Sequence, residues 1–172
     1  MPPIIQQIET HVFSVLVDNE PGVLARVIGL FSGRGYNIES LTVASVDNHL
    51  HLSRITLVTS GTRMVIEQIR AQLSRLVPVR KVVDLTDDGP HVAREIALVK
   101  ICNKGEQRIE ALQLANVYRA RVVDSTPNSF IFEITGSSHK IDAFIGVMEP
   151  LGMVEIVRTG VVALTRGENS FI

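Results

Sequence analysis

The most constraining feature of the chain is an order of strand-like and helix-like segments that occurs twice. Apolar runs rich in Val and Ile predict strands, and apolar residues repeating every three or four positions predict helices. For the first half, the sequence predicts a strand at 11–17, a helix starting near Pro21 and ending at Gly33 to Gly35, strands at 37–46 and 50–59, a helix opened by Thr62, and a strand at 78–85. This β-α-β-β-α-β order is that of a ferredoxin-like fold.

After a polar, turn-rich segment at residues 86–90, the same order returns. The second half is predicted to contain strands at 95–102, 120–124, 130–135 and 153–164, with helices at 106–118 and 141–151. The sequence therefore predicts an α+β protein with two tandem ferredoxin-like (βαββαβ) domains. We place an N-terminal extension at 1–10, the first domain at 11–86, a linker at 87–94, the second domain at 95–166 and a tail at 167–172.

The first predicted helix follows a short polar turn. Asp18 or Asn19 is expected to cap this helix, and Pro21 suits its first turn because the missing N–H would be unpaired there. Apolar residues at helical spacing are expected to face the core, namely Val23, Leu24, Val27, Ile28 and Phe31.

Motifs give no support for catalysis by this chain. The sequence has no G-x-S-x-G, Walker A, H-E-x-x-H or C-x-x-C pattern. His49 and His51 are interpreted as two hydrophilic positions on one strand face rather than as a metal pair. Cys102 is interpreted as a small core residue, and Asp87 and Asp88 as a solvated linker. We therefore expect no catalytic residue and no metal or cofactor bound by this chain.

Composition disfavours nucleic-acid and membrane partners. The net charge is -1 and aromatic residues make up 5%, with no Trp, whereas an RNA-binding sheet needs basic and aromatic residues on its strands. The chain contains no run of about 18 apolar residues and its N-terminus lacks the pattern of a signal peptide. A single cysteine suits a reducing compartment. We expect a cytoplasmic protein with no membrane partner and no nucleic-acid partner.

The turn D-N-E-P-G at residues 18–22 has three interpretations. It is either a capped helix start, a phosphate-binding turn or a site for a free amino acid. A phosphate site is disfavoured because the turn has one glycine and carries Glu20. A free amino acid fits better, since helix amides attract its carboxylate and Asn19 or Asn37 offers an amide oxygen to its ammonium. Spacing alone leaves the capped helix start as the simplest interpretation.

The stretch N-E-P-G-V-L-A-R-V-I-G-L-F-S-G-R-G-Y-N-I-E-S-L-T-V strongly resembles the signature of the small, regulatory subunit of acetolactate synthase. The segments L-S-R-I-T, E-I-A-L-V-K, D-A-F and R-T-G-V-V-A-L-T-R-G match the same family, and the resemblance spans residues 11 to 168. It implies that the first domain is an amino-acid-binding ACT domain and that the second is the family's C-terminal ferredoxin-like domain.

The resemblance also implies a function. The chain would activate a large catalytic subunit, which would carry thiamine diphosphate, Mg and FAD, and would make it sensitive to feedback inhibition by valine in branched-chain amino-acid biosynthesis. ACT domains would form a homodimer with valine at the interface. The implied effector site comprises Asn19, Gly22, Val23 and Leu24 of one chain with Asn37 and Ile38 of its partner.

Two positions depart from the family's pattern in this region. Pro21 stands where relatives often have Ser, and Ala25 where a Ser can occur. The alternative function is a free-standing amino-acid-binding ACT sensor that acts on another partner.

Overall fold

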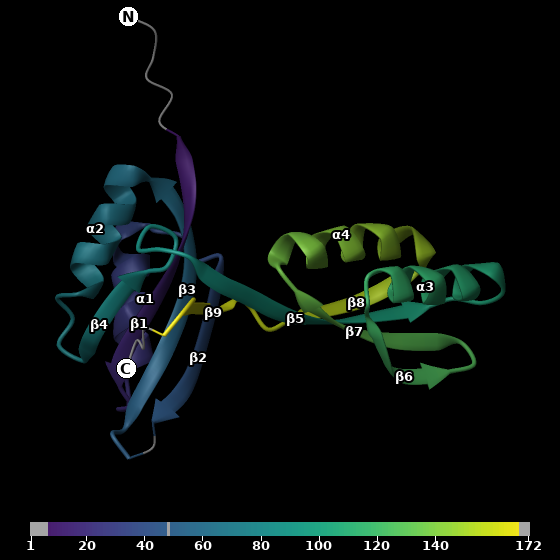
Figure 1. Ribbon diagram of the computed structural model, residues 1–172, viewed down its shortest axis with the longest axis horizontal. Coiled ribbons are helices and arrows are strands. Elements are labelled where there is room, and N and C mark those ends of the chain that lie inside the picture. The colour runs from purple at the N-terminus through teal and green to yellow at the C-terminus, as the bar shows by residue number, and fades with distance from the viewer. Residues whose placement is uncertain (1–6, 48, 169–172) are drawn as a thin grey trace, which may run out of the picture. The chain divides into compact units, whose positions relative to one another are not determined.

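The computed structural model describes residues 7–47 and 49–168, and it separates the chain into two compact units (Figure 1). One unit extends to Val92 and resumes at Val161, and the other spans Ala93–Gly160. In each unit, helices pack on an antiparallel sheet. The α+β class and the two ferredoxin-like arrangements that the sequence predicts are confirmed.

The first unit follows the expected order of elements. They are β1 (Ile8–Asp18), α1 (Val23–Arg34), β2 (Ser40–Asp47), β3 (Leu52–Thr62), α2 (Arg63–Leu73) and β4 (Val79–Asp84). The strands lie in the order β2-β3-β1-β4. β1 starts earlier than predicted because Ile8 pairs with Thr62 of β3, so residues 8–10 belong to the sheet. Residues 1–6 of the predicted extension lie outside the described range.

Both helices of the first unit pack on one face of its sheet. Thr62 caps α2 as predicted, since its hydroxyl accepts a hydrogen bond from the Val65 amide. Burying each large apolar side chain contributes about 1.5–3 kcal/mol. The core consists of Phe13, Val15, Val17, Val23, Val27, Phe31, Ile55, Leu57, Ile66, Ile69 and Leu73.

The C-terminal segment covers the other face of this sheet. In β2, Leu41 packs against the helix-side core, so Ser40 and Thr42 point to the opposite face. There the Val161 amide donates to Ser40 Oγ at 2.8 Å, and Thr42 Oγ1 donates to the Val161 carbonyl at 2.9 Å. Val161 and Ala163 are accordingly buried.

This segment differs from the prediction of one closing strand at 153–164. The structure has two strands, β8 (Met153–Arg158) and β9 (Val162–Thr165), and Gly160 between them has φ of +85°. β9 belongs to the first unit, and it pairs with β5 (His91–Cys102), whose first residues belong to the same unit. The cause is the polar and apolar contact that Val161 and Ala163 make with the sheet, which a local sequence pattern does not reveal.

The second unit repeats the topology. It contains β5 (His91–Cys102), α3 (Glu106–Val117), β6 (Arg121–Thr126), β7 (Ser129–Gly136), α4 (Ser138–Met148), the short helix η1 (Glu149–Leu151) and β8. The strand order is β6-β7-β5-β8, which is equivalent to that of the first unit. α4 starts one turn before the predicted residue 141, because Ser137 Oγ accepts the Lys140 amide and caps the helix.

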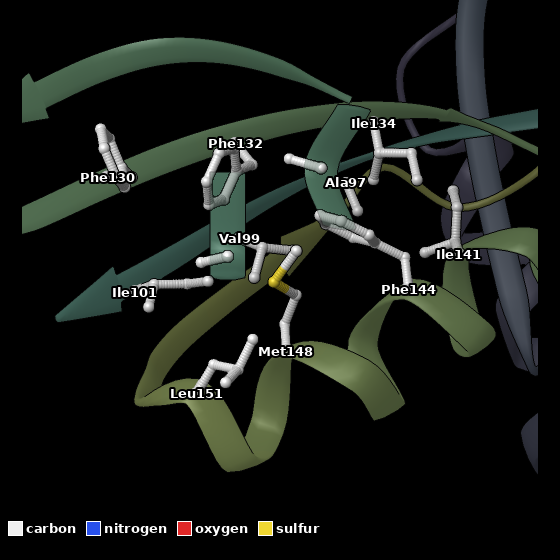
Figure 2. Packing of buried hydrophobic residues seen from close by; sticks show 12 residues of the cluster. Ala97, Val99, Ile101, Phe130, Phe132, Ile134, Ile141, Phe144, Met148 and Leu151 are labelled. Atoms are coloured by element: carbon white, nitrogen blue, oxygen red, sulfur yellow. The ribbon is translucent and has the colours of Figure 1, made fainter. Parts of the chain in front are cut away.

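Figure 2 shows the core of the second unit, where side chains from β5, β7 and α4 interlock. Phe132 and Phe144 meet edge to face with ring centroids 6.3 Å apart. Ile101 of β5 points into this core, whereas the next residue, Cys102, is exposed. The prediction that Cys102 is a core residue is therefore wrong, since successive strand side chains point to opposite faces.

Two further interpretations of polar residues are corrected. His49 and His51 lie in the turn between β2 and β3 rather than on a strand, and His51 has φ of +51°. Asp88 is not merely solvated, because Arg70 donates to both of its carboxylate oxygens, and Asp87 pairs with Arg63. Within residues 7–47 and 49–168, no helix has the length and apolar character needed to cross a membrane.

Candidate functional site

The turn between β1 and α1 is fixed by contacts with residues distant in sequence. Arg80 Nε donates to the Asp18 carboxylate at 2.7 Å, and this hydrogen bond raises the pKa of the Arg80 guanidinium. The Asn19 amide donates to the His51 carbonyl at 2.7 Å. Asp18 is therefore engaged by β4, and neither Asp18 nor Asn19 caps α1. The predicted cap is wrong.

Gly22 occupies the capping position instead. Its φ of +84° and ψ of -5° lie in the left-handed region, which glycine adopts without steric cost. Among the described residues, no side chain caps the helix, and apart from its chain neighbours no atom lies within 4 Å of a Cβ built at Gly22. The backbone of the turn is therefore open to close approach by another molecule.

Amide groups at the start of α1 face this open turn. The Val23 amide makes a long contact of 3.4 Å with the Glu20 carbonyl, and the Arg26 amide donates to Gly22 at 3.1 Å. The Leu24 and Ala25 amides between them have no hydrogen-bond partner within the described part of the chain. Such amides carry partial positive charge and attract an anion.

α1 has a second apolar row that the first unit does not bury. Val23, Val27 and Phe31 lie in the core, as predicted, but Leu24 and Ile28 are 37% and 39% exposed. The prediction that all five residues face the core is thus wrong for two of them. Leu24 and Ile28, four residues apart, form an outward apolar row, which we call the α1 outer row.

The predicted partner residues lie at the other end of α1. The helix has 12 residues and is therefore about 18 Å long. Asn37 follows its C-terminal end, where Thr59 Oγ1 donates to the Asn37 carbonyl at 2.6 Å and the residue itself is exposed. Ile38 is half-buried against the first unit's core.

One chain therefore does not bring the six predicted residues together. Asn19, Gly22, Val23 and Leu24 lie at the start of α1, while Asn37 and Ile38 lie beyond its end. Val23 is 5% exposed, so only its backbone can serve a ligand. A site that uses all six residues needs two chains.

The outer edge of the sheet lies on β2. In the described residues, β3 is the one strand that pairs with β2, so β2 is an edge strand of the sheet. Val43 and Val46 on this strand are 44% and 37% exposed. An edge strand with exposed apolar side chains is suited to pairing with another chain.

Sequence reasoning did not identify the contacts that hold the turn, because Arg80 and His51 are remote in sequence and carry no motif. It also missed a group of potential metal ligands. Within the described residues, His11, Asp84 and Asp87 form one group with metal-ligand spacing. His49 and His51 are not part of this group.

Two family models match the chain. An "AHAS small subunit-like ACT domain" matches residues 13–81, and the family described as "Small subunit of acetolactate synthase" matches residues 94–167. Together these ranges leave only short segments of the chain unmatched.

Individual relatives align with this chain along nearly their whole length. The acetolactate synthase isozyme 3 small subunit of Escherichia coli is 48% identical over 159 residues, covering 92% of this chain and 96% of the relative. The small subunit of Haemophilus influenzae is 44% identical over 163 residues, covering 94% and 99%. The crystal structure of the acetolactate synthase small subunit from Thermotoga maritima superimposes with a TM-score of 0.83 at 38% identity, covering 94% and 99%. The chain belongs to the family of acetolactate synthase small subunits, and its first domain is an ACT domain.

Proposed function

We propose that this chain activates the large catalytic subunit of an acetolactate synthase and makes that subunit sensitive to valine. The observation that carries the proposal is the open turn at Gly22, where the Leu24 and Ala25 amides have no partner among residues 7–47 and 49–168 of a chain of this family. Thiamine diphosphate, Mg and FAD belong to the large subunit in this proposal, and this chain contributes no catalytic residue.

The proposed site recognises the two charged groups of an amino acid. The ligand's carboxylate accepts hydrogen bonds from the Leu24 and Ala25 amides, and its ammonium donates to the amide oxygens of Asn19 and Asn37. Pro21 has no backbone N–H, and Ala25 has no hydroxyl. The Leu24 and Ala25 amides therefore make most of the hydrogen bonds to the ligand's carboxylate.

The ligand's side chain contacts Leu24 of one chain and Ile38 of the other. An apolar pocket distinguishes ligands by about 1–3 kcal/mol per methylene. We therefore expect valine to bind best, with leucine and isoleucine as weaker ligands.

A homodimer with two-fold symmetry supplies the second half of the site. When two α1 helices lie antiparallel, the start of each helix lies beside residues 37 and 38 of the other chain. The α1 outer row provides apolar contact between the helices, and the β2 edges provide backbone groups for a continuous sheet. Two-fold symmetry then gives two equivalent sites per dimer.

Inhibition follows from linkage between valine and the arrangement of the complex. Valine lowers the activity only if it binds the less active arrangement more tightly than the active one. A site shared by two chains meets this requirement, because a bound ligand favours one relative position of the two ACT domains.

Reconstitution tests the proposed function. The large subunit is assayed for acetolactate formation from pyruvate with and without this chain, and then with L-valine or D-valine. We expect this chain to raise the activity, L-valine to lower it, D-valine to have no effect, and this chain alone to form no acetolactate. An amino-acid-binding chain that leaves the large subunit's activity unchanged would instead support the free-standing sensor.

A further inference from the structure

A cluster of ionisable side chains lies in the first unit, away from the β1–α1 turn. His11 is near the start of β1, Asp84 ends β4, and Asp87 lies in the turn that follows. The exposed fractions of His11 and Asp84 are only 2% and 1%. Because β1 advances about 3.4 Å per residue, His11 is roughly 24 Å from Asp18, so the cluster is separate from the proposed amino-acid site.

Both ring nitrogens of His11 face carboxylate oxygens. Nδ1 lies 2.8 Å from Asp84 Oδ2, and Nε2 lies 3.4 Å from Glu9 Oε2. A neutral imidazole has one N–H and one lone pair. With the N–H on Nδ1, His11 donates to Asp84. With the N–H on Nε2, His11 donates to Glu9, and its Nδ1 lone pair is available to a metal ion that Asp84 also binds.

The surrounding contacts match those of a metal-binding histidine. Such a histidine donates its other ring N–H to a carboxylate, which fixes the ring's orientation. Glu9 is placed to have this role for His11. Asp84 is also held, since its Oδ1 accepts the Thr86 amide at 3.1 Å. This leaves Asp84 Oδ2 directed at His11.

The turn after β4 presents a third ligand. The Asp88 amide donates to the Asp84 carbonyl at 2.8 Å, and Arg70 holds the Asp88 carboxylate with bonds of 3.1 and 2.9 Å. These bonds close the turn and bring an Asp87 oxygen, an Asp84 oxygen and a His11 nitrogen within 4.8 Å of one another.

We propose that His11, Asp84 and Asp87 bind a divalent first-row transition-metal ion of the Zn²⁺ type. One imidazole and two carboxylates suit such an ion, with water in a fourth position. Ligand atoms of a tetrahedral ion with bonds of about 2.1 Å lie about 3.4 Å apart. The His11 Nδ1 and Asp84 Oδ2 atoms, now 2.8 Å apart, therefore have to separate slightly, and any pair near the 4.8 Å limit of the group has to close.

Asp87 is the most exposed of the three ligands and has the most freedom to move. Its present contact is with Arg63 Nη2 at 3.5 Å, and the side chains are 39% and 65% exposed. An exposed ion pair of this kind contributes little to stability, so a metal ion can displace Arg63 from the Asp87 carboxylate at little cost. The bound ion would link β1 to the turn after β4 and would stabilise the first unit.

The test uses the full chain, freed of metal with a chelator that is then removed. Zn²⁺ is titrated calorimetrically, and thermal unfolding is followed with and without Zn²⁺. We expect one saturable site per chain and a rise in melting temperature with Zn²⁺. The substitution Asp87→Asn should lower the affinity at least about tenfold without affecting the fold, because the side chain lies in an exposed turn.

Two matched variants identify the site. Asp124→Asn removes an exposed carboxylate of β6 in the second unit and should leave zinc binding unchanged. His49→Asn tests the histidines of the β2–β3 turn and should also leave it unchanged. Loss of binding in His49→Asn, equal binding by Asp87→Asn and the unaltered chain, or no binding by the unaltered chain would each overturn the proposal.

Discussion

Gly22 combines a left-handed backbone conformation with open space around its Cα, which a ligand can approach. The residue has φ of +84°, and in the described part of the chain no atom outside its chain neighbours lies within 4 Å of a Cβ position. The cost of a side chain at this position therefore comes from backbone strain and not from steric clashes. Asn and Asp tolerate the left-handed region better than other non-glycine residues, so they form a matched pair that differs in charge alone.

We predict that Gly22→Asp raises the valine concentration for half-inhibition at least about tenfold relative to Gly22→Asn, which corresponds to about 1.4 kcal/mol. The added carboxylate would accept the amides that the ligand's carboxylate needs and would repel that carboxylate. Acetolactate formation by the reconstituted complex is measured over a range of valine concentrations, with each variant's valine-free activity as its reference. Equal valine sensitivity of the two variants would show that the carboxylate is bound elsewhere.

At this scale, the sequence predicted the location of the turn but not its contacts. The motif around Gly22 is local, and so is the hydroxyl cap at Thr62, which the structure confirms. Asp18 instead pairs with Arg80, and His11 with Asp84. These partners are brought together by the pairing of β1 with β4, which no local spacing encodes.

Among the elements, α1 shows why periodicity overestimates a core. Five apolar residues at helical spacing suggest one buried face, yet the fold buries Val23, Val27 and Phe31 and leaves Leu24 and Ile28 outside. Apolar residues at helical spacing indicate an apolar face of a helix. The spacing does not show whether that face packs in the core of its own domain or against another chain.

β9 is the element whose start and contacts the sequence pattern did not predict. Its residues alternate, with Ala163 buried and its neighbours Val162 and Leu164 exposed. The alternation was present in the sequence, but the break at Gly160 and the contacts of Val161 with β2 depend on the folded first unit.

This alternation leads to a stability prediction. Ala163→Asp would bury an unpaired carboxylate and should lower the free energy of unfolding by more than about 3 kcal/mol. Val162→Asp, one residue earlier and 54% exposed, should change it by less than about 1 kcal/mol. Urea denaturation followed by circular dichroism measures both variants. Similar losses in the two variants would contradict the burial of Ala163.

For the whole molecule, the repeated topology was predictable because it depends on the order of elements, which the hydrophobic pattern records. The sheet orders β2-β3-β1-β4 and β6-β7-β5-β8 are equivalent. The sharing of the proposed amino-acid site between two chains was implied by the family resemblance and not by the hydrophobic pattern. The length of α1, which separates the two parts of that site within one chain, supports the proposal.

A lysine in the α1 outer row should therefore separate the proposed dimer. Ile28→Lys would place a charge in the apolar contact between two α1 helices, and we predict a shift toward monomer together with weaker valine binding. Ile109→Lys makes the same change on α3 of the second unit, where Ile109 is 59% exposed, and should leave the dimer intact. Sedimentation velocity distinguishes the outcomes, and a dimer unaffected by Ile28→Lys would exclude this interface.

The most direct test of the central claim is a calorimetric titration of the complex between this chain and the large subunit with L-valine, with D-valine as the control. The account predicts saturable binding of one L-valine per regulatory chain, because a symmetric dimer has two equivalent sites, and no binding of D-valine. The assembled complex is used so that a valine site that forms only in the presence of the large subunit or of a second regulatory chain is complete. Heats that do not saturate with L-valine, or that are the same for both enantiomers, would contradict the proposal that two ACT domains form a valine site.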